Sequence, residues 1–295
     1  KYGAIKYKLA EQAIKSFATE SALYRLSQNI DDTIQSAIDE GMDKQKAVLE
    51  GLREFAAECA ILKVHGSETL DYVVDEAVQI YGGMGYSAEA PVERSYRDAR
   101  INRIFEGTNE INRMLTVDIL LKRAMKGELD LLPAAQKVAE SLMDIPDFDT
   151  DEADFAEEKK LVQGMKDAVL LIAGAAAQKI GPALPKEQEI IMNIADIAME
   201  AYVCESTLLR IIKMKNRLGD AKIQEQTNMM KVYLYEAAER VAASGREAIY
   251  SFAEGDEQRG MLMGIKRYTK LQPFNVKEAR RMIADKLIAE NKYCY

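Results

Sequence analysis

The chain has 295 residues and a formal net charge of −8, and 48% of its residues are hydrophobic and 30% are charged. This composition is typical of a globular protein with a hydrophobic core, and the length allows two domains of roughly 100–200 residues each. Because phosphate binding requires a basic surface, the acidic balance and the lack of a long basic run argue against nucleic acid as a partner.

The abundance of Ala, Leu, Glu, Lys, Met and Ile, with only six prolines, predicts an all-α protein. A first long helix is expected from about residue 5 to 38, and Glu40–Asp43 ends it. A second helical region is expected over 44–81, with an interruption near His65–Ser67. The first residues already show a helical pattern without an N-cap or initiator Met. We therefore expect a fragment that begins inside a helix.

Two shorter helices are expected next in the chain. One starts near Pro91, because proline fits the first turn of a helix. The other runs from Thr108 to about Lys126, with threonine as the N-cap. The charged run Glu93–Arg100 lies on the first of these helices and predicts an ordinary salt-bridged face.

A change of composition predicts a domain boundary near residue 128. Gly127–Pro133 interrupts the helical pattern, and residues 145–152 form an acidic, turn-rich linker. The predicted domains are 1–127 and 128–295. The second is expected to be a further helical bundle, with long antiparallel helices at about 153–180, 186–217, 221–253 and 276–289.

Several residue types limit the chemistry of the chain. The longest apolar run, Ala168–Ala177, is shorter than the ~18–20 residues that cross a bilayer, so we interpret it as a buried helix segment. Three widely spaced cysteines suit a reducing cytoplasm. A single histidine, His65, argues against histidine-based metal sites, and we expect it to be structural or solvated.

Tyr233 and Tyr235 are expected in the core, and the basic residues of the last helix are expected on a solvated face (Lys277, Arg280, Arg281 and Lys286).

Two segments are candidates for a functional site. Phe105–Ile111 places Glu106 beside a glycine at a helix start, where an acid usually only complements the helix dipole. The functional interpretation is a general base whose pKa rises when substrate excludes water, with Gly107 leaving space beside it. Gln79–Tyr86 is a glycine-rich turn without the GxGxxG spacing of a dinucleotide fingerprint, and alone it predicts only a turn between helices.

Taken together, three segments change this interpretation. Gln79–Tyr86, Pro91–Ile101 and Ile104–Ile111 strongly resemble, in order and spacing, the C-terminal α-domain of acyl-CoA dehydrogenases across roughly residues 1–126. Residues 128–295 resemble the additional helical region of the very-long-chain type and its bacterial relatives. The N-terminal helical domain and the middle β-domain of that family have no counterpart in this sequence.

The resemblance implies FAD-dependent oxidation of the Cα–Cβ bond of a fatty acyl-CoA to the trans-2-enoyl-CoA, as in fatty acid β-oxidation. Glu106 stands where the family's catalytic base removes the α-proton, while flavin N5 accepts the β-hydrogen. The Glu106 backbone N–H and a flavin ribityl hydroxyl would polarise the thioester carbonyl, and Glu106 and Gly107 would contact the substrate.

The same resemblance implies the FAD contacts. One set of residues matches the turn that contacts the FAD of a neighbouring subunit: Gln79, Ile80, Tyr81, Gly82 and Gly83. Thr108 and Glu110 match residues that contact the flavin or its ribityl-phosphate arm, although Glu110 replaces the glutamine of some relatives. The fragment alone is expected to bind FAD weakly and to be inactive.

The implied partners are a fatty acyl-CoA substrate, an electron-transfer flavoprotein as electron acceptor and a second copy in a homodimer. A cytoplasmic location in a bacterium is expected, and peripheral contact with a membrane stays open. A different, non-enzymatic function also stays open. The chain could serve as a helical assembly or interaction module derived from this family, without activity of its own.

Overall fold

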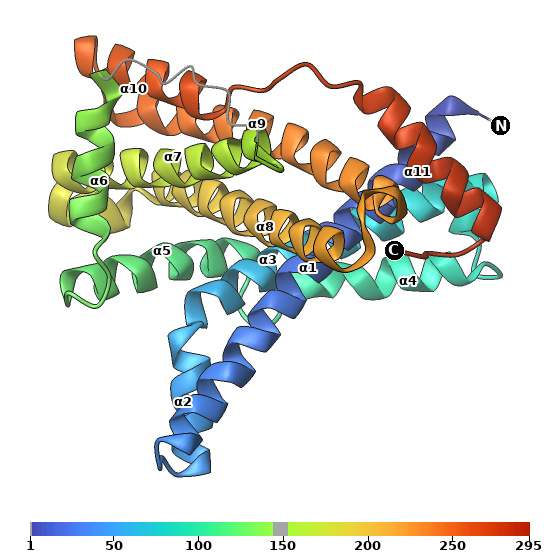
Figure 1. Ribbon diagram of the computed structural model, residues 1–295, viewed down its shortest axis with the longest axis horizontal. Helices are drawn as coiled ribbons and strands as arrows, with labels where there is room; N and C mark the ends of the chain where they lie inside the picture. Colours follow the sequence, from blue (N-terminus) through green and yellow to red (C-terminus); the bar gives the residue numbers. More distant parts are fainter. Residues whose placement is uncertain (1, 144–152) are drawn as a thin grey trace.

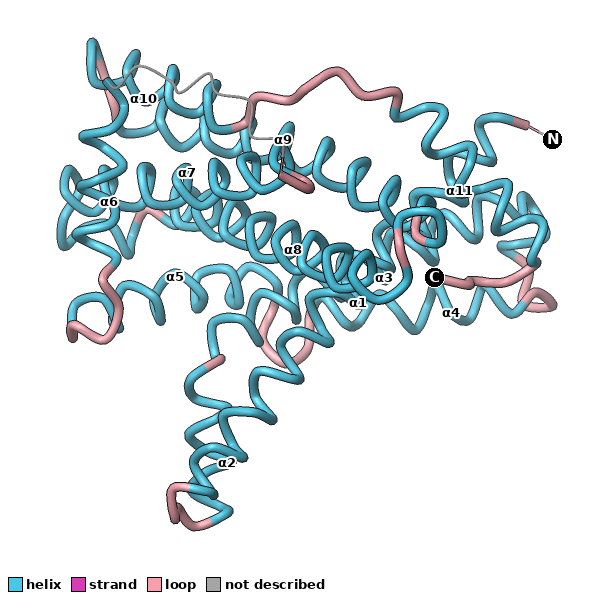
Figure 2. The backbone as a smooth tube through the Cα atoms, in the orientation of Figure 1, coloured by secondary structure: helices cyan, strands magenta, loops and turns pink. Residues whose placement is uncertain are grey.

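The computed structural model describes residues 2–143 and 153–295. Every regular element within these ranges is helical, which confirms the all-α prediction (Figure 2). The predicted acidic linker at 145–152 lies outside the described residues.

The first part of the chain contains five α-helices and two short 3-10 helices among the described residues (Figure 1). Their bounds agree closely with the predicted helices at 5–38, near Pro91 and at 108–126. In chain order they are α1 (Gly3–Asp39), α2 (Lys44–Glu54), α3 (Ala56–Tyr81), η1 (Gly82–Tyr86), α4 (Pro91–Arg100), η2 (Ile101–Arg103) and α5 (Asn109–Met125).

The second part packs long helices beside one another (Figure 1). The four predicted helices of this part are all present, within a few residues of the expected bounds. In chain order the elements are α6 (Leu131–Glu140), η3 (Ser141–Met143), α7 (Ala156–Ile180), η4 (Gly181–Lys186), α8 (Gln188–Leu218), η5 (Asp220–Lys222), α9 (Gln224–Phe252), α10 (Gly255–Tyr268) and α11 (Val276–Glu290).

Three predicted features of the helix pattern were wrong. The break expected at His65–Ser67 does not exist, because α3 runs through it and the break lies at Phe55 instead. Tertiary contacts hold that segment helical, since His65 and Ser67 both make buried hydrogen bonds to other helices. Helices α6 and α10 were not predicted. Pro133 is tolerated in the first turn of α6, and Gly255 begins α10 rather than only ending α9.

Helix α8 lies at the centre of one continuous hydrophobic core. Nearly half of its 31 residues are buried. The same core cluster contains Ile14 and Phe17 of α1 and Val117 of α5 together with residues of α7, α9 and α11. The core therefore continues across residue 128, and the position of a domain boundary there stays a prediction.

One helical stretch among the described residues, Ala156–Lys186, is long and apolar enough to cross a membrane by length and composition. No uninterrupted apolar run in the sequence predicts it. Within the run Ala168–Ala177, which was expected to be buried, Ala168, Leu171 and Ile172 are at most 3% exposed, whereas most of the other residues are only partly buried. The stretch packs against α8 and α9, as a core helix does.

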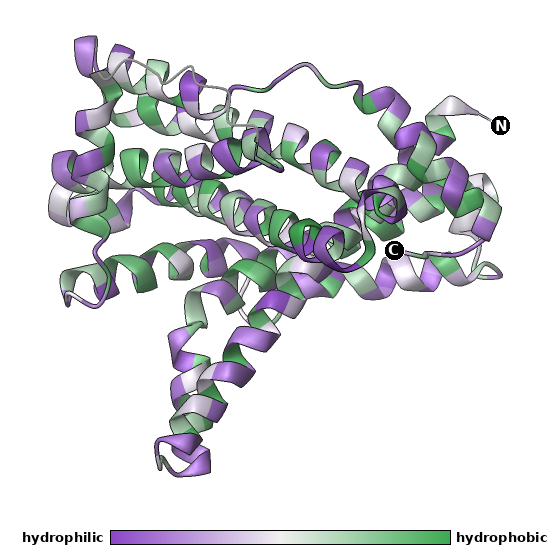
Figure 3. Cartoon of the chain, viewed as in Figure 1, coloured by the Kyte–Doolittle hydropathy of each residue, from purple (hydrophilic) through white to green (hydrophobic). Residues whose placement is uncertain are grey.

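The ends of α1 and α2 form a hairpin that projects from the body of the molecule (Figure 1). Its turn, Glu40–Asp43, is hydrophilic (Figure 3), and Asp43 accepts hydrogen bonds from the first free amides of α2. Gly51 lets α2 approach Ile34 of α1, because a Cβ at that position would lie 2.6 Å from the Ile34 side chain.

The basic residues of α11 do not all lie on a solvated face, as the sequence analysis expected. Arg280 is mostly buried, with 12% of its side chain exposed, and it donates from Nε to Glu11 at 2.6 Å and from Nη2 to Glu236 at 2.5 Å. Glu11 is only 1% exposed, so Arg280 supplies the charge that its carboxylate needs. This three-residue cluster joins α1, α9 and α11.

Replacement of Arg280 by alanine is expected to destabilise the protein by about 3–5 kcal/mol, because the buried Glu11 carboxylate loses its hydrogen-bonded partner charge and keeps only Lys15, whose ammonium lies 3.9 Å away. Urea unfolding followed by circular dichroism measures the loss. Arg281→Ala is the matched control, since its side chain is half exposed and its one ion pair with a described residue is to Glu278 on the same helix. The control should change stability by less than about 0.5 kcal/mol. Equal effects of the two variants would contradict this account.

A buried chain of polar side chains joins α3 to α8 and α9. His65 Nε2 lies 2.8 Å from the Tyr233 hydroxyl oxygen, and that hydroxyl donates to Glu200 at 3.1 Å. Arg240 donates to both oxygens of Glu200, at 2.5 and 3.0 Å. Burial lowers the pKa of His65 to about 4, because it disfavours the charged imidazolium. The structural role expected for His65 and the core position of Tyr233 are therefore confirmed.

The buried His65 is expected to make stability depend on pH between about 4 and 6.5. In that interval the unfolded chain, with an ordinary histidine pKa, binds a proton that the folded chain does not. The free energy of unfolding therefore does not depend on His65 titration above about pH 6.5, and it falls as the pH is lowered toward 4. The fall is expected to exceed that of the His65→Gln protein by up to about 3 kcal/mol. Urea unfolding at several pH values measures this difference. Parallel pH dependence of the two proteins would contradict it, since the chain has no other histidine.

Candidate functional site

Residues Ile104–Thr108, here called the Glu106 loop, connect η2 to α5. Glu106 and Gly107 both have left-handed backbone angles, with φ of 56° and 77°. Glycine adopts this region freely, but for a residue with a side chain such strain costs of order 1–3 kcal/mol. The sequence predicted a relaxed turn at Gly107 and not the strain at Glu106. Strained residues of this kind cluster at functional sites, and they persist only where the surroundings hold them.

A single buried amide holds the backbone of this loop. The Asn112 side chain donates from Nδ2 toward three successive carbonyls, those of Glu106 at 3.3 Å, Gly107 at 2.9 Å and Thr108 at 3.1 Å. A Cβ on Gly107 would lie 3.0 Å from the same Nδ2. The loop conformation therefore depends on both the glycine and the asparagine.

Helix α3 supplies a second set of contacts. Lys63 donates to the Gly107 carbonyl at 2.6 Å and to Asn109 Oδ1 at 2.8 Å. Asn109, which is 3% exposed, also donates to Ser67 at 3.0 Å and to Glu68 at 3.1 Å. The first residue of α5 is thus fixed by side chains on α3.

The Glu106 side chain itself is exposed at the start of α5. Thr108 is the N-cap of this helix and accepts from the Ile111 amide at 3.3 Å, which confirms the predicted N-cap. The neighbouring Phe105 and Ile111 are also exposed, at 47% and 51%. Glu106 therefore lies at the positive end of a helix, within an apolar surface that a covering ligand or protein would remove from water.

Glu110 is the second residue of α5. A hydrogen bond from its own backbone amide, and then one from the Thr108 hydroxyl, hold the pKa of Glu110 below its ordinary value. Its carboxylate stays ionised at neutral pH and can only accept hydrogen bonds. It therefore suits a hydroxyl group of a ligand and not a phosphate.

The second predicted segment, Gln79–Gly83, lies at the end of α3. Gly82 has φ of 64° and ends the helix, and a Cβ on Gly82 or Gly83 would meet nothing within 4 Å. Tyr81 is 54% exposed. Gly85 anchors the turn, because a Cβ there would lie 2.6 Å from the Val78 carbonyl. The turn thus presents open backbone that a ligand could approach closely.

The structure does not bring these two segments together within one chain. Lys63, which contacts the Glu106 loop, and Gly82 are separated by 19 residues of one helix, which corresponds to about 28 Å along its axis. The two segments face open solvent at different points along α3. A ligand shorter than this separation could not meet both segments of one chain.

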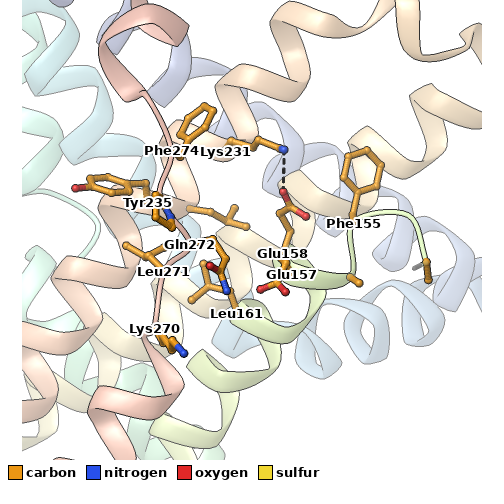
Figure 4. Close-up of a pocket in the computed structure, with 14 residues that line it drawn as sticks. Phe155, Glu157, Glu158, Leu161, Lys231, Tyr235, Lys270, Leu271, Gln272 and Phe274 are labelled. Carbon is orange, nitrogen blue, oxygen red and sulfur yellow. Dashed lines mark ion pairs between the residues drawn. The ribbon is translucent and has the colours of Figure 1, made fainter. Parts of the chain in front are cut away.

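A half-open pocket lies in another part of the molecule (Figure 4). It has a volume of about 370 Å³ and is lined by the start of α7, by α9 and by the segment 270–274. Lys231 and Glu158 form an ion pair of 3.3 Å across it. None of the predicted site residues lines this pocket. Within the described residues, no group of three or more His, Cys, Asp or Glu side chains could hold a metal ion.

Sequence reasoning missed the residues that support the loop. They are Lys63, Ser67, Glu68, Asn109, Asn112 and Arg113. Asn109 and Asn112 lie inside or just beyond the motif that drew attention to Glu106. The available signal in the sequence was that two asparagines closely follow Gly107.

Comparison with known proteins gives a consistent result for both parts of the chain. The family model described as "Acyl-CoA dehydrogenase, C-terminal domain" matches residues 1–121, and a second model with the same description matches residues 164–267. A probable acyl-CoA dehydrogenase of Bacillus subtilis (strain 168) is 39% identical over 97% of this chain and 48% of its own length. The very long-chain specific acyl-CoA dehydrogenase of Rattus norvegicus is 44% identical over 38% of this chain and 14% of its own length.

Among solved structures, an acyl-CoA dehydrogenase from Bacillus anthracis in complex with FAD superposes with a TM-score of 0.95. It is 42% identical to this chain, and the match covers 100% of this chain and 50% of that one. The chain thus spans about half the length of the full-length bacterial relatives that it matches. The matched segments contain the Glu106 loop, the turn at Gln79–Gly83 and the long helices of the second part. The chain belongs to the acyl-CoA dehydrogenase family and corresponds to its C-terminal part.

Proposed function

We propose that this chain supplies the catalytic base of an FAD-dependent dehydrogenase that converts a fatty acyl-CoA to the trans-2-enoyl-CoA. One observation carries the proposal. Glu106 is held in a strained left-handed conformation by the buried Asn112, at the position that resembles the family's base. A residue that only complemented the helix dipole would not require this strain.

In this proposal the Glu106 carboxylate removes the α-proton of the acyl thioester. The exposed apolar side chains around it, Ile104 and Phe105, are covered when substrate binds, and exclusion of water raises the pKa of the base toward the range useful for proton transfer. The backbone N–H of Glu106 donates to the thioester carbonyl. It thereby stabilises the negative charge that develops on the carbonyl oxygen as the proton leaves.

The residues present fit FAD as the cofactor, which when bound supplies the acceptor for the β-hydrogen. Thr108 and the ionised Glu110 at the start of α5 offer hydroxyl-compatible contacts for a ribityl chain. The open backbone of Gly82 and Gly83, which no side chain covers, suits close approach of a large planar or phosphate-bearing group.

The separation of the two segments along α3 supports a homodimer in which each FAD contacts Thr108 of one copy and Gly82 of the other. An electron-transfer flavoprotein as acceptor, a cytoplasmic location and a role in fatty acid β-oxidation belong to the same proposal. Because the chain spans about half of its full-length bacterial relatives, the activity is proposed for a protein that joins this chain to the parts they also contain. The purified 295-residue chain is expected to retain FAD well below one equivalent.

Replacement of Glu106 by glutamine in that FAD-loaded protein is expected to lower acyl-CoA-dependent bleaching of the flavin by at least about 1,000-fold, because an amide cannot accept the α-proton. The bound FAD should be unchanged, since the side chain lies on the substrate side. Stopped-flow absorbance measures the bleaching, and the flavin spectrum measures retention. Glu89→Gln, an exposed acid in the turn before α4, is the control.

Near-normal bleaching by the Glu106→Gln protein would place the base elsewhere. Absence of bleaching in the unaltered FAD-loaded protein would favour the other function, a helical assembly or interaction module without activity. The two outcomes are distinct, because the first requires an active parent protein and the second an inactive one.

Replacement of Gly107 by alanine tests the conformation of the loop. The φ of 77° strains any side chain there, and the added Cβ would press on the Asn112 amide at 3.0 Å. The expected result is a fall in kcat of at least about tenfold with FAD retained, since the base is displaced and not removed. Gly260→Ala, in open space on α10, is the control. Unchanged kcat in the Gly107 variant would show that the loop geometry does not matter for turnover.

A further inference from the structure

A line of contacts leads from the second part of the chain to the Glu106 loop. Asp196 of α8 accepts from Arg113 Nε at 2.6 Å. The two terminal nitrogens of Arg113 donate to both oxygens of Glu68 on α3, at 2.7 and 3.0 Å. Glu68 in turn accepts from Asn109 at 3.1 Å. Asp196 is therefore three contacts away from the first residue of α5.

Arg113 is the central group in this line. Its side chain is 14% exposed, and all of its polar contacts with described residues are the three to Glu68 and Asp196. A guanidinium fixed on two edges by two carboxylates cannot rotate, whereas one fixed on a single edge can turn about that pair. Asp196 therefore determines the orientation of Arg113 and, through Glu68, that of Asn109.

The same face of α8 is linked to α3 a second time, through a tyrosine of α9. Glu200 lies one helical turn after Asp196, and it reaches His65 through Tyr233. His65 lies on α3 between Lys63 and Ser67, the two residues that contact Gly107 and Asn109. Met199, which lies between Asp196 and Glu200 on α8, packs on Ile61 and Val64 of α3. Helix α8 thus contacts the back of the α3 segment that holds the loop.

We propose that Asp196 is a positioning residue, through which α8 of the C-terminal region fixes the conformation of the Glu106 loop. The statement about the loop conformation depends only on the contacts above. Its consequence for turnover rests on the proposed function of Glu106. The second part of the chain then has a direct role in the geometry of the site, beyond completing the hydrophobic core.

Hydrogen exchange in the 295-residue chain tests the structural half of this proposal. The backbone amides of Ile111 and Asn112 bond to the hydroxyl and the carbonyl of Thr108, so their exchange reports on the loop and the helix start. In Asp196→Ala these amides are expected to exchange about tenfold faster, the effect of losing one charge-assisted hydrogen bond. In Asp196→Asn, which retains an acceptor, the exchange rates should lie between those of the parent chain and those of Asp196→Ala.

Glu205→Ala is the matched control, because Glu205 also lies on α8. It pairs with Arg25 of α1 and Lys166 of α7 and makes no contact with the loop residues. Urea unfolding of each variant separates a local effect from a global one. Equal exchange at Ile111 and Asn112 in the Asp196→Ala and Glu205→Ala proteins would overturn the proposal. Should Asp196→Ala not fold, Asp196→Asn against Glu205→Gln gives the same comparison.

Turnover by the FAD-loaded, full-length protein tests the functional half. Asp196→Ala is expected to lower kcat about tenfold with little change in KM, because a misplaced base affects the chemical step more than binding. Asp196→Asn should restore most of the loss, and Glu205→Ala should match the parent. If Asp196→Ala and Glu205→Ala impaired both kcat and KM to the same extent, Asp196 would have a merely structural role. If the parent protein shows no turnover, the proposed function fails, while the exchange result still decides the role of Asp196.

Discussion

The packing of α8 is the constraint on which the rest of the structure depends. This helix is buried along nearly half of its length and contacts α1, α3, α5, α7 and α9. Its apolar residues complete a core that extends from α1 to α11, and its acids Asp196 and Glu200 pair with Arg113 and Arg240. A helix that carries the buried carboxylate of Glu200 and the partly buried carboxylate of Asp196 must find its partner cations in a fixed register, because an unpaired buried charge costs several kcal/mol. The positions of α3 and α5 follow from that register.

The candidate site is a consequence of this arrangement. Because α3 and α5 are fixed against each other, Lys63, Ser67 and Asn112 can together hold a loop in which Glu106 is strained. The Glu106 carboxylate remains exposed, whereas the groups that hold the loop are buried (Ser67 and Asn112) or partly buried (Lys63), so the structure separates them from the group that would react. A site of this kind retains its shape when a substrate arrives, and little reorganisation is required during the reaction.

The sequence predicted the long helices well, since their apolar spacing and the Thr108 N-cap are local signals. It failed at α6 and α10, because Gly127–Pro133 and Gly255 were interpreted as interruptions, whereas Pro133 lies in the first turn of α6 and Gly255 begins α10. It identified Glu106 and the turn at Gln79–Gly83 from a family resemblance.

The supporting residues could not be predicted in the same way. The contact between Arg113 and Asp196 joins positions 83 residues apart, and the role of Asn112 depends on carbonyls that only a left-handed loop turns toward it. Arg280 was expected in solvent because an amphipathic helix face does not show which of its cations will meet a buried acid. Side chains that act through tertiary contacts leave no periodic signal in the sequence.

The central claim is that Glu106 is the base that faces the α-carbon of an acyl thioester. A crystal structure of the FAD-loaded, full-length protein with an unreactive acyl-CoA analogue tests it most directly. The account predicts a Glu106 carboxylate oxygen roughly 3–3.5 Å from the α-carbon, the separation of a near-attack geometry, with the loop still bonded to Asn112. A different carboxylate at that position, or an analogue bound away from the start of α5, would contradict it.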